Sequence, residues 1–97
     1  MKKNGYALQK FFEATYALVG DGKIMQRLGC AHIYLVSLNE VDLPEDLRGR
    51  FRKLRETLSY RVMHFSYKPS IIRIRAPQSG KLAQEIFDIY TALRRYQ

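Results

Sequence analysis

The chain has 97 residues, of which 46% are hydrophobic and 27% are charged, and its formal net charge is +8. This length suits one domain over residues 1–97, and this composition provides enough apolar surface for a folded core, which argues against a second core and against disorder throughout. No apolar run approaches the roughly 20 residues of a membrane-spanning helix, and a single cysteine, Cys30, leaves no intramolecular disulfide framework. We therefore expect a cytoplasmic protein that makes no membrane contact.

The first predicted helix lies between Tyr6 and Val19. Its larger apolar residues recur at steps of three and four, as one face of a helix does. The face predicted in this way consists of Leu8, Phe11, Phe12, Leu18 and Val19, with Thr15. Gly20-Asp21-Gly22 ends the helix, because glycine readily adopts the left-handed conformation that follows a helix.

The second predicted helix has the regular spacing of a packed seam. Steps of four and three separate its core positions, Ile24, Leu28, Ala31, Leu35 and Leu38. Three small residues, Gly29, Cys30 and Ala31, lie together in its middle and predict a close crossing with a neighbouring helix.

The third predicted helix begins with a capping signal. Asp42 is followed three residues later by Glu45, with Pro44 in the first turn, an arrangement similar to a capping box. One apolar stripe follows, formed by Leu47, Phe51, Leu54 and Leu58.

The stretch between Ser59 and Pro77 is rich in β-branched and aromatic residues and is interrupted by Lys68-Pro69-Ser70. This pattern favours a small β-hairpin, with an extended loop as the competing assignment. Ser79 can then cap a last helix, whose core positions are Leu82, Ile86, Ile89 and Leu93. The predicted fold is mainly α, a compact antiparallel four-helix arrangement with an irregular or β-hairpin-like insertion between helices three and four.

The sequence contains no complete catalytic, metal or cofactor motif. Residues 75–82 resemble a phosphate-binding loop, but Arg75 stands where a glycine is needed and Leu82 where a Ser or Thr is needed. Cys30 and His32 would point about 200° apart on a helix, which prevents joint coordination of one metal ion. We therefore predict a chain without catalytic residues, cofactor or metal.

Positive charge is concentrated in one third of the chain. Residues 47–77 contain nine basic residues and one acidic residue, whereas the remainder contains eight of each. Such segregation favours an anionic partner, and aromatic residues nearby could stack on nucleic-acid bases. The candidate contacts are Arg48, Arg52, Arg55, Arg61, Arg73 and Arg75. Solvated helix faces and sites for acidic proteins also carry arginines, so these alternatives keep equal weight.

Two functional hypotheses follow from these patterns. The first is a small non-catalytic interaction or regulatory module that associates with itself or with another protein, since four short helices leave apolar surface uncovered. The second is nucleic-acid binding through residues 48–75, with arginines contacting phosphates.

Overall fold

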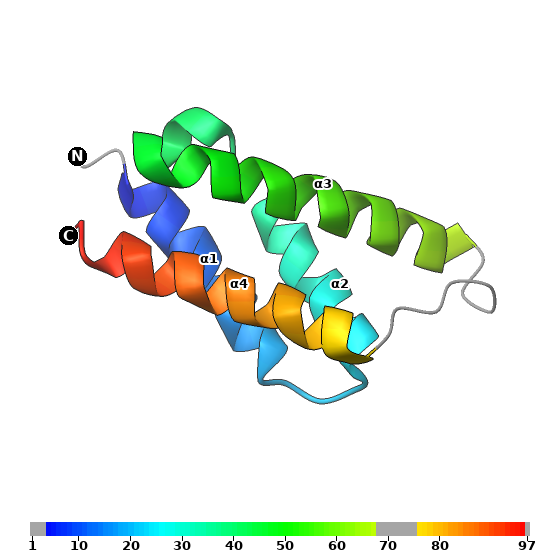
Figure 1. Cartoon of the computed structure of the whole chain (residues 1–97). Coiled ribbons are helices and arrows are strands. Elements are labelled where there is room, and N and C mark those ends of the chain that lie inside the picture. Colours follow the sequence, from blue (N-terminus) through cyan, green and yellow to red (C-terminus); the bar gives the residue numbers. More distant parts are fainter. Residues whose placement is uncertain (1–3, 68–75, 97) are drawn as a thin grey trace.

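Four α-helices and one short 3-10 helix make up the regular structure of residues 4–67 and 76–96, the part of the chain that the computed structural model describes (Figure 1). The elements are α1 (Asn4–Leu18), α2 (Ile24–Leu35), η1 (Glu40–Asp42), α3 (Glu45–Tyr67) and α4 (Ala76–Arg94). Side chains are described for residues 4–58 and 80–96.

Each helix packs against its neighbours in a closed ring. Helix α1 contacts α2 and α4, and α3 contacts the same two helices, so α1 and α3 lie diagonally across the core. Helices α3 and α4 run in opposite directions, whereas α1 and α2 are inclined to this pair (Figure 1). The Cα radius of gyration is 13.1 Å, close to the ~13 Å of a folded domain of 100 residues. A mainly α, compact arrangement of four helices is thus confirmed.

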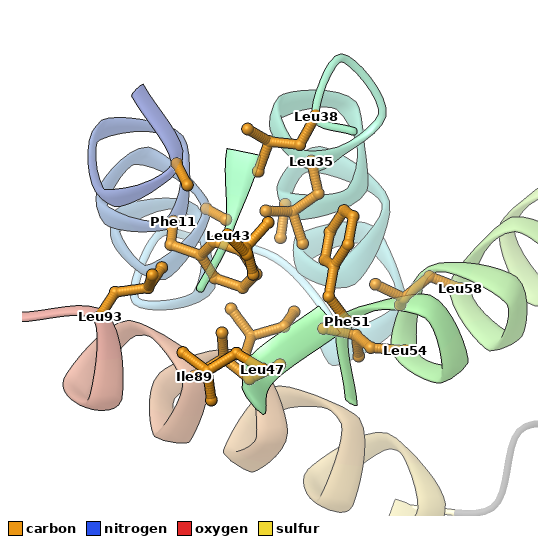
Figure 2. Close-up of a cluster of buried hydrophobic side chains, with 14 of the residues drawn as sticks. Phe11, Leu35, Leu38, Leu43, Leu47, Phe51, Leu54, Leu58, Ile89 and Leu93 are labelled. Carbon is orange, nitrogen blue, oxygen red and sulfur yellow. The ribbon is translucent and has the colours of Figure 1, made fainter. Parts of the chain in front are cut away.

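Two phenylalanines meet at the centre of the core. The rings of Phe11 on α1 and Phe51 on α3 are 5.9 Å apart in an edge-to-face geometry, and both side chains are fully buried (Figure 2). Aliphatic side chains from every helix surround them, including the predicted stripes of α2, α3 and α4. The buried members of those stripes are Leu28, Ala31, Leu35, Leu38, Leu47, Leu54, Leu58, Ile86, Ile89 and Leu93.

The buried face of α1 differs from the predicted one. Phe12 and Val19 were expected in the core but are 54% and 74% exposed. The buried residues are Ala7, Phe11, Ala14 and Leu18. Ala7 and Ala14 belong to this face because small side chains allow neighbouring helices to approach closely. A prediction that counts only large apolar residues therefore places the buried face of α1 too far round the helix.

The predicted capping box of α3 is wrong. A carboxylate oxygen of Asp42 accepts the backbone N–H of Asn39 at 2.9 Å and therefore belongs to η1. Helix α3 begins after Pro44, whose carbonyl accepts the N–H of Leu47 at 2.9 Å. Helix α1 ends at Leu18, just before the predicted Gly20-Asp21-Gly22 turn, but the glycine with a positive φ, +104°, is Gly22, which precedes α2.

The hairpin-like insertion is not supported. Helix α3 continues through residues 59–67, and residues 68–75 lie outside the described part of the chain. Each residue added to a helix gains a backbone hydrogen bond, which outweighs the helix-propensity penalty of a β-branched or aromatic residue, below about 0.7 kcal/mol. An isolated two-stranded hairpin, in contrast, is only marginally stable. Helix α4 begins at Ala76, so Ser79 lies inside it and is not its cap, and Pro77 occupies the first turn where no N–H is needed.

The different environments of two adjacent phenylalanines predict very different mutational effects. Phe11→Ala leaves a cavity in the core and should lower the free energy of unfolding by about 3–5 kcal/mol. Phe12→Ala is the matched control and should cost less than about 1 kcal/mol, as surface changes do. Urea denaturation followed by circular dichroism measures both values, and equal losses would contradict the buried face assigned to α1.

Candidate interaction surface

Two of the residues predicted to contact nucleic acid bind the connection between α2 and α3. Arg48 donates through Nε to the carbonyl of Leu43 at 2.9 Å, and Arg55 donates through Nη1 to the carbonyl of Leu38 at 2.7 Å. The guanidinium of Arg55 also lies 5.0 Å from the centroid of the Phe51 ring. Backbone carbonyls near a protein interior need hydrogen-bond donors, so both arginines stabilise the fold.

A third predicted contact forms an ion pair in the same place. Arg52 binds Glu40 on η1 through two parallel hydrogen bonds of 2.9 and 2.7 Å, and Nη2 of Arg55 lies 3.8 Å from the same carboxylate. The hydrogen bonds from Arg52 hold the pKa of Glu40 below its usual value, although partial desolvation opposes this shift. The arginine flank of α3 is therefore directed at residues 38–43.

Two further polar contacts join α3 to α4. Arg50 binds Glu85 through hydrogen bonds of 3.0 and 2.8 Å, which raise the pKa of Arg50. Near the start of α3 and just after the end of α4, the Tyr96 hydroxyl donates to the Asp46 carboxylate at 2.6 to 2.7 Å, which raises the pKa of Tyr96. The side chains of the remaining candidates, Arg61, Arg73 and Arg75, lie outside the described residues.

An open cavity of about 360 Å³ lies beside the Arg50–Glu85 pair. Its other described lining residues are Lys53, Leu54, Thr57 and Leu82. The Thr57 hydroxyl donates to the backbone carbonyl of Lys53, one turn earlier in α3, at 2.9 Å. Among these described lining residues, the one carboxylate is that of Glu85, and it is already bound to the guanidinium of Arg50. The cavity is therefore poorly equipped for acid–base catalysis.

The most distinctive exposed feature is a row of aromatic side chains along the contact of α1 and α4. We call it the aromatic seam, and it consists of Phe12, Tyr16, Val19, Phe87 and Tyr90. The ring of Phe12 lies 6.5 Å from that of Tyr16 and 6.2 Å from that of Tyr90, and Phe87 lies 6.5 Å from Tyr90. The rings thus form one continuous surface across two helices.

Much of this surface is accessible to solvent. Tyr16 is 72% exposed and Phe87 is 48% exposed, in addition to the exposed Phe12 and Val19. With about 200 Å² for a whole aromatic side chain, Phe12, Tyr16 and Phe87 together expose roughly 350 Å². An exposed apolar patch of about this size often marks a binding surface on a protein.

The acidic side chains nearest in sequence to the seam have polar partners of their own. Glu13 lies 3.5 Å from Lys10, Glu85 binds Arg50 on α3, and Asp88 accepts a hydrogen bond from Gln84. Arg94, 5.9 Å from the Tyr90 ring centroid, places a cation at one end of the seam. These three carboxylates are therefore each bound to a polar group outside the rings.

A second exposed apolar area lies on the outer face of α2 and after its end. It consists of Cys30, Ile33 and Val36, of which Ile33 is 67% exposed. The predicted close crossing at Gly29 is not seen, since a side chain there would meet no atom within 4 Å. His32 is half-buried, and burial lowers its pKa. This area is aliphatic and lacks the joined rings of the seam.

Sequence reasoning missed the seam because it assigned Phe12 and Val19 to the core. The available signal was the spacing: Phe12, Tyr16 and Val19 follow one another at steps of four and three, one or two positions after Phe11, Ala14 and Leu18. Two such stripes on one helix indicate one buried face and one neighbouring exposed face.

Other kinds of site find no support in the described residues. These residues contain no group of three or more His, Cys, Asp and Glu side chains that could hold a metal ion. Within the same part of the chain, every helix is too short or too polar to cross a membrane. Comparison of the chain with known protein families, with curated proteins and with solved structures finds no match.

The contacts of Arg55 predict a structural role. Arg55→Met keeps the length of the side chain but removes its hydrogen bond to Leu38, so we expect a loss of about 1–3 kcal/mol in unfolding free energy. Lys53→Met is the control on the exposed side of α3 and should change it by less than about 0.5 kcal/mol. Chemical denaturation of both variants tests this difference, and a silent Arg55→Met would argue against the contact.

The lowered pKa of Glu40 predicts a dependence of stability on pH. A carboxylate whose pKa is lower in the folded state stabilises the fold at pH values above its ordinary pKa of 4.5. This contribution is lost as the pH falls through the pKa of the folded state. Wild type should therefore be more stable than Glu40→Gln at about pH 7, and the difference should shrink as the pH is lowered well below 4.5. Denaturation curves over this pH range measure this, and a constant difference would contradict it.

Proposed function

We propose that this chain is a small, non-catalytic interaction module and that the aromatic seam is its docking surface. The proposal depends on one observation: Phe12, Tyr16 and Phe87 are exposed, although the helices that carry them also supply residues to a buried core. Aromatic residues are enriched in protein interfaces because they bury large areas at a small cost in conformational entropy.

The surroundings of the seam support the same function. Exposed neutral residues flank it, among them Gln9 and Gln84, whose amides can both donate and accept hydrogen bonds. Protein interfaces typically combine an apolar centre with a polar rim of this kind.

Nucleic-acid binding through residues 48–75 is the alternative, and the described contacts favour it less. Arg48, Arg52 and Arg55 already donate to carbonyl or carboxylate oxygens, so a phosphate would have to compete with those partners. Charge reversal at these positions would disturb the connection between α2 and α3, and a loss of binding in such a variant would not identify a nucleic-acid contact.

A site-specific photo-crosslink in the native host tests the docking surface. A benzophenone amino acid at Tyr16 should yield a discrete adduct, because this side chain is the most exposed ring of the seam. The same amino acid at Ile33, which is similarly exposed on α2, is the control and should yield little or none. No adduct from Tyr16, or an equal yield of the same adduct from Ile33, would contradict the proposal.

A further inference from the structure

We infer that the partner seated on the aromatic seam is a second copy of this chain, related to the first by a two-fold axis. This inference rests on the proposed docking function and names its partner. Three features of the chain carry it: the apolar area of the seam, the polar groups beside it, and the distribution of charge over the four helices.

The apolar area matches what a stable dimer needs. A standard interface buries about 800 Å² on each partner, of which about 57% is non-polar, or roughly 450 Å². The three exposed aromatic side chains supply roughly 350 Å². Most of a Val19 side chain, 74% exposed, lies in the same row and contributes much of the remainder. The seam thus provides nearly the whole apolar part of such an interface.

The polar groups beside the seam suit pairing with an identical surface. In a two-fold interface, residues near the axis approach their own copies, so charged groups would repel each other there. Gln9, three residues before Phe12, and Gln84, three residues before Phe87, are exposed and neutral, and Thr91 is half-buried with its hydroxyl bound to the Phe87 carbonyl. Arg94 places a charge only at one end of the seam. An amide can donate to the amide of its own copy and accept from it.

The charge distribution permits two basic chains to meet at this surface. The whole net charge of +8 arises from residues 47–77, because the rest of the chain has equal numbers of acidic and basic residues. Described residues 47–67 belong to α3, which lies diagonally across the core from α1. Two copies joined through α1 and α4 therefore meet at the neutral part of the molecule, where repulsion is weakest.

The outer face of α2 is the competing surface for such a dimer. It exposes Cys30, Ile33 and Val36, none of which carries an aromatic ring. Aliphatic residues contribute less often to interface energy than tyrosine. We therefore assign the dimer contact to the seam and use Ile33 as the control position.

Light scattering of the purified full chain tests this inference. Over about 5–500 µM, wild type should shift from a mass near 11.4 kDa toward twice that value. Tyr16→Ser should raise the dissociation constant about 30-fold or more, as loss of an interface hot spot does. Tyr16→Phe, which keeps the ring, and Ile33→Ser, which changes α2, should both dimerise like wild type. Circular dichroism shows that each variant is folded.

The outcomes separate this inference from the proposed function. A chain that stays monomeric at the highest concentration overturns the second copy as partner, and so does a dimer that Ile33→Ser weakens and Tyr16→Ser does not. If the purified chain is monomeric but the Tyr16 crosslink forms with a chain of another mass, the docking function stands and this inference falls. If neither association nor crosslink is found, both fall.

Discussion

The edge-to-face contact between Phe11 and Phe51 is the interaction on which the rest of the structure depends. Helices α1 and α3 are not neighbours, so their backbones are too far apart for small side chains to meet, and two large rings bridge the diagonal of the bundle (Figure 2). Ala7 and Ala14 on the same face of α1 then let the flanking helices close around the rings. A domain of this size has one small core, so the loss of a central contact lowers the stability of the whole fold.

The arginines of α3 stabilise the connection between α2 and α3. The chain must turn sharply between α2 and α3, and the carbonyls of Leu38 and Leu43 lie where the turn meets the third helix. Arg48 and Arg55 supply donors to these carbonyls, and Arg52 holds Glu40 of the same turn. A strongly basic segment thus serves partly as internal support, which lowers its value as a signature of nucleic-acid binding.

The same geometry separates two properties of the surface. Positive charge gathers along α3, while the contact of α1 and α4 presents aromatic rings with neutral neighbours. A small bundle cannot bury every large side chain. Several of those left exposed lie together here, because Phe12 and Tyr16 are one helical turn apart and the ring of Phe12 lies against Tyr90. The proposed docking function and the proposed dimer both arise from this separation.

The number of helices and the buried stripes of α2, α3 and α4 could be predicted from the amino-acid pattern, because large aliphatic residues at steps of three and four are sufficient to define those faces. The tertiary structure decided the face of α1, where alanines are buried and Phe12 is not, since close helix approach depends on neighbours that a single helix does not encode. It also decided that α3 continues to Tyr67 instead of yielding to a hairpin, and that Arg48, Arg52 and Arg55 bind the connection between α2 and α3. Their partners are mainly backbone carbonyls, which every residue carries and no pattern of side chains reveals.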